Sequence, residues 1–203
     1  MEKKIKIAID AMGGENSPAK IIDGIDISLK KNNENYFLLY GDKDILNKNI
    51  SNNKLITSNS EIIDTKDVIL DKESPLTAAK KGKESSMWKA IESLKNKKSD
   101  ITLSAGNTGA LLIISRLILS TIEGISRPAL AALWPNNKNM SVVLDLGANI
   151  DCNEKNLIDF SSMGSALFKS LFTNNNPKVA LLNVGLEEHK GNEIIKNTFS
   201  FLK

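Results

Sequence analysis

The feature that constrains the fold most is an alternation between short apolar runs rich in β-branched residues and longer stretches with helical periodicity. The apolar runs are nearly continuous, which is typical of strands buried on both faces. They cover residues 4–10, 36–40, 100–105, 129–133, 141–146 and 178–184. The helical stretches cover residues 18–31, 76–96, 108–122, 154–172 and 192–202. This alternation predicts an α/β fold, a doubly wound, mostly parallel sheet with helices on both sides.

The organisation of the chain is that of one domain. Its 203 residues can bury one sizeable core, and we expect a single α/β domain over residues 1–203. Residues 41–75 are less clear, with 54–58 and 67–70 as possible strands. The last helical pattern is still running at Lys203, so we expect a chain truncated at its C-terminus.

Composition excludes several classes of function. The net charge is +3, but the positive charges are almost all Lys, they alternate with acids, and basic helices and RNP-like aromatic motifs are absent. Nucleic acid is therefore not an expected partner. The most hydrophobic stretch, 109–125, is interrupted by Arg116 and Glu123 and is too short to span a membrane. A single cysteine, Cys152, excludes an intrachain disulfide and a multi-Cys metal site, and a cytoplasmic location is expected.

Four strand-to-helix loops are unusually rich in Gly combined with Asn or Asp. They are residues 9–18, 104–110, 144–153 and 182–193. Taken singly, each is most simply a tight turn or a helix cap. In open α/β sheets, however, ligands bind outside the carboxyl ends of the strands, where helix N-termini present unpaired N–H groups. Four such loops at one edge predict a pocket for an anion.

Familiar catalytic machinery is missing. There is no GxGxxG after the first strand and no GxxxxGK[ST], so dinucleotide and NTP sites are not supported. The only histidine, His189, has no Ser or Cys partner in a nucleophile elbow, and Cys152 is interpreted as a structural thiol. We therefore expect catalysis by positioning and electrostatics, with no cofactor and no metal.

Six segments in order carry a resemblance to a known family. They are "AIDAMGGENSP", "SAGNTGALL", "GISRPALA", "VLDLGANIDC", "MGSALF" and "LLNVGLEEHKGNE". The chain resembles the PlsX family, the phosphate acyltransferases of bacterial phospholipid synthesis, from residue 5 to residue 203. The resemblance implies a three-layer α/β/α sandwich of the isocitrate/isopropylmalate dehydrogenase kind. The chain departs from the family at Glu15 and Asn16, where Asp and His are usual. It also ends before the family's further strands and its helical region for dimer and membrane contact.

The resemblance implies a reaction in which inorganic phosphate attacks the thioester of a long-chain acyl-acyl carrier protein. The products are acyl phosphate and free carrier protein. Phosphate is itself the nucleophile, so neither a Ser-His pair nor a cofactor is required. The family also implies a homodimer and peripheral membrane contact through a segment that this chain lacks.

Individual residues take roles on the same basis. Lys190 and Asn192 are the expected donors at the developing oxyanion, and Asp145, Asn149 and Asp151 are expected to orient them. Substrate binding is assigned to a larger set, Asp10, Gly13, Gly14, Asn107, Thr108, Gly109, Gly147, Asn183 and Gly191. Several carboxylates would surround the anion, Asp10, Asp145, Asp151, Glu187 and Glu188. Which of them pair with Lys190 is left open by the sequence.

Two alternatives remain open at this point. One is a phosphotransacetylase-like transfer from an acyl-coenzyme A, which would need only a short acyl pocket. The other is a truncated binding module that holds a carrier protein or a partner subunit without turnover. The Lys surplus is either a docking surface for the acidic carrier protein or ordinary solvated charge.

Overall fold

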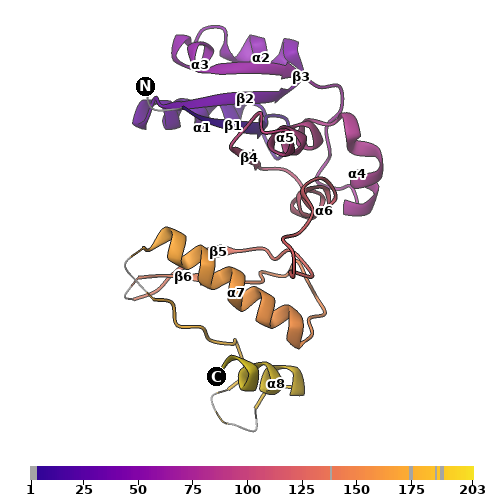
Figure 1. Cartoon of the computed structure of the whole chain (residues 1–203). Helices are drawn as coiled ribbons and strands as arrows, with labels where there is room; N and C mark the ends of the chain where they lie inside the picture. Colours follow the sequence, from indigo (N-terminus) through magenta and orange to yellow (C-terminus); the bar gives the residue numbers. More distant parts are fainter. Residues whose placement is uncertain (1–3, 138, 174–175, 186, 188–189) are drawn as a thin grey trace. The chain divides into compact units, whose positions relative to one another are not determined.

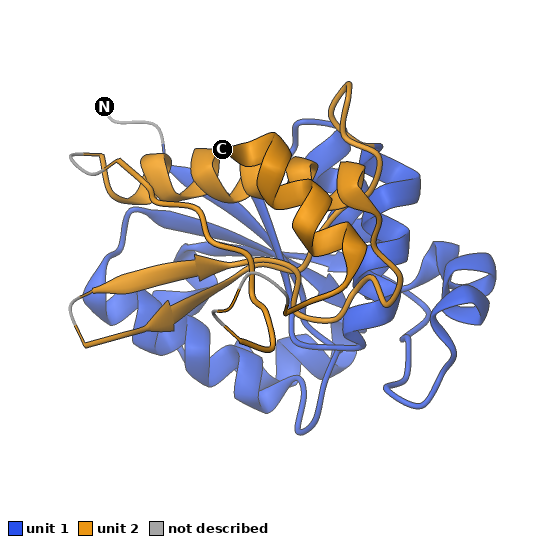
Figure 2. Ribbon diagram, turned by 90° about the horizontal axis from the view of Figure 1, so that it is seen from below, with its two compact units in different colours: residues 1–120 blue, residues 121–203 orange. Residues whose placement is uncertain are grey.

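The computed structural model describes residues 4–137, 139–173, 176–185, 187 and 190–203. The chain divides into two compact units, Met1–Ser120 and Thr121–Lys203, which are coloured separately in Figure 2. The expectation of one domain over residues 1–203 stays a prediction. No helix in the described ranges is long and apolar enough to cross a membrane.

Unit 1 is built on a four-stranded parallel sheet with the strand order β3-β2-β1-β4 (Figure 1). Its strands are β1 (Ile5–Asp10), β2 (Asn35–Gly41), β3 (Ser60–Asp64) and β4 (Ile101–Ser104). Its helices are α1 (Ala19–Lys31), α2 (Lys43–Ile50), α3 (Lys54–Ser58), α4 (Pro75–Lys81), the 3-10 turn η1 (Gly82–Glu84), α5 (Ser86–Lys95) and α6 (Thr108–Leu119). The parallel sheet expected from the alternating pattern is confirmed.

Helices cover both faces of this sheet because successive strand residues point to opposite sides. Ile9 and Leu39 pack with the buried side chains of α1, α2 and α3. Their sequence neighbours Ala8 and Leu38 pack on the other face, against Ala90 of α5. Unit 1 is therefore a three-layer α/β/α arrangement. A further apolar cluster joins α4, α5 and α6.

Unit 2 combines a strand pair with two helices. β5 (Ala132–Pro135) and β6 (Met140–Val143) pair antiparallel, and α7 (Glu154–Leu171) and α8 (Glu193–Leu202) follow (Figure 1). Asn153 and Asn156 form a capping box that starts α7. Asp159 of α7 accepts hydrogen bonds from Ser126 and Lys155. Burial opposes ionisation of this carboxyl, but these bonds outweigh it and hold the pKa of Asp159 below its usual value.

Both strands expected within residues 41–75 were wrong, and two elements of this region were missed. Residues 54–58 form the helix α3 rather than a strand, because the Asn53 side chain accepts hydrogen bonds from the N–H groups of Leu55 and Ile56. The strand of this region is β3 (Ser60–Asp64), which follows α3 directly in the sequence. Residues 67–70 form no strand. The helix α2, capped by Asp42, was not expected.

The bounds of other elements also differ from those expected from the sequence. The helical stretch 76–96 is interrupted, because Ser85 caps a new helix, α5, and η1 separates it from α4. The expected strand 129–133 is placed at Ala132–Pro135, and its antiparallel pairing departs from the parallel pattern of unit 1. Residues 178–184 pair with no strand in the described part of the chain.

The buried face of β2 supports a first prediction. Leu39 is fully buried between α1, α2 and α3, whereas Leu117 of α6 is 60% exposed. Leu39→Ala should lower the free energy of unfolding by about 2–5 kcal/mol, because it removes packed methyl groups and leaves a cavity. Leu117→Ala is the matched control and should change it by less than about 0.5 kcal/mol. Urea unfolding measures both, and equal losses would contradict this packing.

Candidate functional site

The first candidate site lies in unit 1, at the junction between the ends of β1 and β4, where the Asp10 carboxylate is almost fully buried. One carboxylate oxygen accepts hydrogen bonds from the Gly13 N–H at 3.1 Å and the Ser86 hydroxyl at 2.5 Å. The other accepts from the Ser104 hydroxyl at 2.7 Å. Asp10 therefore links the loop after β1 to the end of β4 and the start of α5. Its direct contact with phosphate stays a prediction.

The loops that follow β1 and β4 approach each other through glycines. A Cβ added to Gly13 would lie 2.3 Å from a carboxylate oxygen of Asp10 and 3.2 Å from the Cα of Gly106. A Cβ added to Gly14, which has a φ of +90°, would lie 2.4 Å from the carbonyl oxygen of Ala105. Only residues without side chains fit this contact. The predicted Gly13 and Gly14 therefore shape the site by close backbone approach.

Asn107 caps α6 and also anchors a neighbouring loop. Its side-chain oxygen accepts the Ala110 N–H at 3.0 Å. Its side-chain amide donates to the carbonyl oxygens of Asp71 at 3.1 Å and Glu73 at 2.9 Å. Both ends of this side chain thus have protein partners, and a phosphate contact through it stays a prediction.

The first turn of α6 leaves two main-chain donors open. Within the described part of the chain, the N–H groups of Thr108 and Gly109 have no hydrogen-bond partner. Thr108 is exposed, and Gly109 packs so closely on Pro75 that a Cβ there would lie 2.6 Å from its ring. Open N–H groups at a helix N-terminus attract anions. This turn can therefore bind an oxyanion through its backbone.

A second candidate site lies in unit 2 and centres on Asp145. One of its carboxylate oxygens accepts the Leu130 N–H at 2.7 Å. The other accepts the N–H of Asn149 at 2.6 Å and its side-chain amide at 3.1 Å, and that amide also donates to the carbonyl of Pro128. The structure thus pairs Asp145 with Asn149, and together they hold the segment before β5. Their expected role in orienting Lys190 and Asn192 stays a prediction.

The predicted residues around the start of α8 also lie together. Gly191 has a φ of +87°, and a Cβ there would lie 2.6 Å from the side-chain oxygen of Asn183. The Asn183 amide donates to the Lys190 carbonyl at 3.3 Å. Asn192 caps α8 by accepting the Ile195 N–H at 2.9 Å. The Lys190 side chain is exposed and forms no ion pair with a described residue.

Other residues singled out from the sequence have few contacts or lie outside the described residues. Gly147 has a φ of +91°, with no atom near enough to meet a side chain there. Asp151 is exposed, and its carbonyl accepts a hydrogen bond from Arg127 at 3.1 Å. His189 and Glu188 lie outside the described residues.

A cavity of about 580 Å³ in unit 2 collects several predicted side chains. Asp145, Asn149 and Asn192 line it together with Cys152, and most of its remaining lining comes from apolar residues of β6, α7 and the segment 177–182. Burial raises the pKa of the Cys152 thiol, and the charge of Asp145 adds to the shift. A thiol held neutral is a poor nucleophile, which agrees with a structural role.

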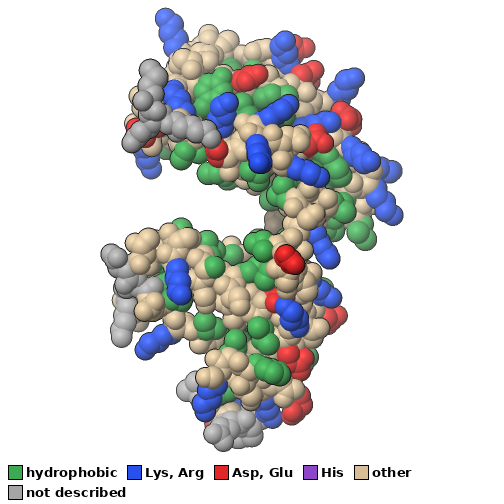
Figure 3. All heavy atoms as spheres, viewed as in Figure 1, with side chains coloured by type: hydrophobic (Ala, Val, Ile, Leu, Met, Phe, Trp, Pro, Cys, Tyr) green, Lys and Arg blue, Asp and Glu red, His purple; other side chains and the backbone are tan. Residues whose placement is uncertain are grey.

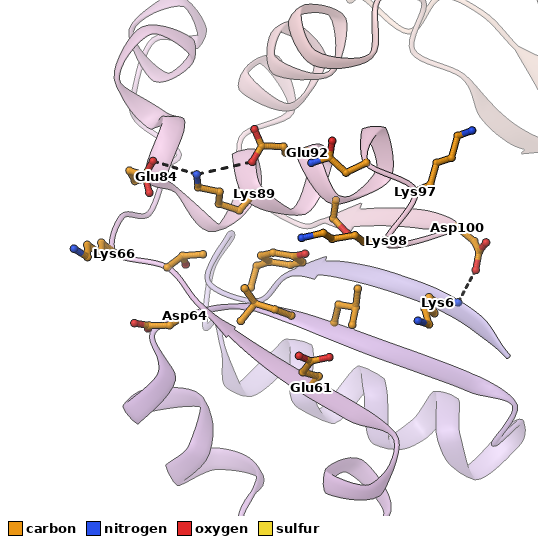
Figure 4. Close-up of a pocket in the computed structure, with 16 residues that line it drawn as sticks. Lys6, Glu61, Asp64, Lys66, Glu84, Lys89, Glu92, Lys97, Lys98 and Asp100 are labelled. Carbon is orange, nitrogen blue, oxygen red and sulfur yellow. Dashed lines mark hydrogen bonds and ion pairs between the residues drawn. The ribbon is translucent and has the colours of Figure 1, made fainter.

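A second cavity, of about 620 Å³, lies in unit 1 between α5 and the strands β2 and β3 (Figure 4). Lys and acidic side chains surround it, and Lys89 pairs there with Glu84 at 3.1 Å. The buried hydroxyl of Thr65 lines this cavity without a hydrogen-bond partner in the described structure. None of the residues predicted from the sequence lines it.

Sequence reasoning missed Ser86 as a partner of Asp10. The two residues lie 76 positions apart, and no motif connects them. Ser104 stands inside a motif that was noticed, but its hydrogen bond to Asp10 was not expected. No group of three or more metal-ligating side chains occurs among the residues that the structure describes.

Comparison with solved structures defines the class of fold. The chain is similar to the EutD phosphotransacetylase from Staphylococcus aureus, with a TM-score of 0.64 and 16% sequence identity, over 98% of this chain and 63% of that one. At this identity the likeness concerns the fold alone. It agrees with the α/β fold expected from the sequence.

Sequence comparison then gives the family. Residues 5–203 match the family described as "Fatty acid synthesis protein". The chain is 62% identical over 202 residues to a phosphate acyltransferase of Pelagibacter ubique, covering 100% of this chain and 60% of that protein. It is 41% identical to a phosphate acyltransferase of Rhodopseudomonas palustris, over 100% of this chain and 58% of that protein. It is 43% identical to one of Ehrlichia ruminantium, over 98% of this chain and 59% of that protein. The chain therefore belongs to this family, and the resemblance to PlsX is confirmed. It spans about 60% of the length of these relatives.

The Asp10 junction leads to a second prediction. Asp10→Ala should lower the free energy of unfolding by about 1–3 kcal/mol, because it leaves the Ser86 and Ser104 hydroxyls and the Gly13 N–H without their acceptor. Asp10→Asn keeps the shape and one acceptor oxygen and should lose less. Asp23→Ala on the exposed side of α1 is the control. Chemical denaturation compares the three variants, and an Asp10→Ala protein as stable as the control would refute the role of this carboxylate.

Proposed function

We propose that the chain transfers a long-chain acyl group from acyl-acyl carrier protein to inorganic phosphate, forming acyl phosphate. Family membership is the main support, since the relatives named above are phosphate acyltransferases. The observation that carries the proposal is the pair of unpartnered N–H groups at the start of α6. A site of this kind binds phosphate without a metal or cofactor.

The chemistry follows from the substrates. A phosphate oxygen forms a bond to the thioester carbonyl carbon, and the carbonyl oxygen becomes an oxyanion. When the oxyanion collapses, the carbon–sulfur bond breaks and the carrier's sulfur leaves as a thiolate, which takes up a proton. The protein has to hold one anion and stabilise a second one as it forms, and both tasks are electrostatic.

The residues divide these tasks in the proposal. We assign phosphate binding to the N–H groups of Thr108 and Gly109 and to the Thr108 hydroxyl, which is exposed at the first turn of α6. We assign stabilisation of the oxyanion to the ammonium group of Lys190 and the side-chain amide of Asn192. The Asn192 oxygen is occupied by the Ile195 N–H, and this hydrogen bond fixes the direction of the amide.

Asp145 acts through its neighbours in this proposal. Its carboxylate holds Asn149 by two hydrogen bonds, and both residues line the unit 2 cavity with Asn192. Homodimerisation and peripheral membrane contact belong to the same proposal and rest on the resemblance alone.

The phosphate site gives a third prediction. Proline is well tolerated at the first position of a helix, so Thr108→Pro removes one N–H and the hydroxyl while α6 still forms. Thr108→Ala removes only the hydroxyl and is the matched control. Because a hydrogen bond to a charged group contributes about 1.5–3 kcal/mol, Thr108→Pro should weaken phosphate binding at least about tenfold. Isothermal titration with phosphate is the measurement. Unchanged affinity in Thr108→Pro would remove the main-chain site.

The oxyanion donors give a fourth prediction. Lys190→Ala and Asn192→Ala should each lower turnover roughly a hundredfold or more, since each removes a donor that acts on charge formed in the transition state. Lys169→Ala, an exposed lysine of α7, is the charge-matched control and should retain full turnover. The assay follows phosphate-dependent consumption of palmitoyl-acyl carrier protein. Normal turnover in both site variants would show that these roles are wrong.

The same assay separates the alternatives. Acetyl-coenzyme A replaces palmitoyl-acyl carrier protein as the donor, at equal phosphate concentration. Acetyl phosphate formed in preference to the long-chain product would favour the phosphotransacetylase-like reaction. Carrier binding without turnover of either donor would favour the binding module.

A further inference from the structure

The segment formed by α4 and η1 lies directly beside the open first turn of α6. Pro75, the first residue of α4, packs on Gly109, and the loop before it is held by the Asn107 side chain. α4 and α6 share an apolar cluster that includes Ala78, Ala79 and Ala110. The N-terminal end of α4 is therefore adjacent to the first turn of α6, where the N–H groups of Thr108 and Gly109 lie.

The exposed side of this segment is basic with one apolar residue. Lys80, Lys81 and Lys83 are exposed and form no ion pair with any described residue. The one acid within α4 and η1, Glu84, pairs with Lys89 of α5 at 3.1 Å. Leu76 is 65% exposed and stands one helical turn before Lys80, on the same face. Figure 3 shows Lys and Arg side chains gathered over this part of unit 1.

We infer that Leu76, Lys80, Lys81 and Lys83, which we call the α4 surface, dock the acidic carrier protein that delivers the acyl group. The inference rests on the proposed function, because it takes its acyl donor from there. Three lysines without an ion pair to a described residue provide charge complementarity to an acidic partner, and the exposed Leu76 provides an apolar contact at the N-terminal end of the segment. Because a helix rises 1.5 Å per residue, Lys80 lies only about 8 Å along the axis from Pro75, the residue that packs on Gly109.

Docking of this kind has a recognisable dependence on salt. Exposed charges steer association mainly by raising the association rate, and mobile ions screen this effect. Binding of the carrier should therefore weaken steeply as ionic strength rises. The weakening should depend on the α4 surface and not on the total charge of the protein.

The test is a charge reversal with a matched control. The triple variant Lys80→Glu, Lys81→Glu, Lys83→Glu is compared with Lys31→Glu, Lys48→Glu, Lys54→Glu, which makes the same change at exposed positions of α1, α2 and α3. Surface plasmon resonance measures binding of palmitoyl-acyl carrier protein, without phosphate, at low and high salt. Thermal unfolding checks that both variants fold. Leu76→Ser tests the apolar contact without changing charge.

The expected result is a loss of carrier affinity of about tenfold or more in the α4 triple variant, mostly in the association rate, with little loss in the control. Leu76→Ser should weaken binding through faster dissociation. Equal affinity in the two triple variants, or no carrier binding by the unmodified chain, would overturn the inference. Failure of the proposed function is distinguishable, because it would appear as absent turnover in a chain whose carrier binding still depends on the α4 surface.

Discussion

The hydrogen bonds of the Asp10 carboxylate are the interaction on which the arrangement of unit 1 depends. Asp10 ends the central strand β1, and its two oxygens accept donors from three places that are far apart in the sequence. A buried carboxylate is tolerated only when such donors replace the water it has lost. The strand ends, the glycine loop and the start of α5 are consequently held in one arrangement. That arrangement places β4, and therefore the turn into α6.

At the loops, amide side chains are hydrogen-bonded to the protein, whereas some main-chain N–H groups are left open. The amide side chains of Asn107, Asn149 and Asn183 satisfy protein groups, whereas the N–H groups of Thr108 and Gly109 have no protein partner in the described ranges. The hydrogen-bonding groups of these three amide side chains therefore serve the protein itself, and their contact with a substrate stays a prediction. The open donors at the start of α6 belong to the main chain, which every sequence possesses and only the fold can expose.

The α/β class, the parallel sheet and the glycine-containing loops after β1 and β4 could be predicted because each depends on local patterns. Strand periodicity, Gly after a strand and Asn before a helix are all visible within ten residues. The role of Ser86 could not be predicted, since its contact with Asp10 is made only when α5 packs on β1. The helix at 54–58 was missed because a five-residue run that contains Ile and Thr gives no clear pattern for either a helix or a strand. The hydrogen bonds of the Asn53 cap favour the helix.

The pairing of β5 with β6 shows a second limit. Apolar runs identify strands but not their direction. Because β5 ends at Pro135 and β6 begins at Met140, the connection is too short for a parallel crossover, and the strands pair antiparallel. The segment 178–184 has the composition of a strand and no strand partner among the described residues. Composition indicates what a segment could pair with, and only the neighbouring backbone determines whether it does.

The contact between Gly13 and Gly106 has a mechanical consequence. Only hydrogen atoms separate the two backbones there, so neither loop can shift sideways without pushing the other. The turn after β1 and the turn into α6, which follow the neighbouring strands β1 and β4, are therefore coupled sterically. A ligand held at either turn would also restrict the other.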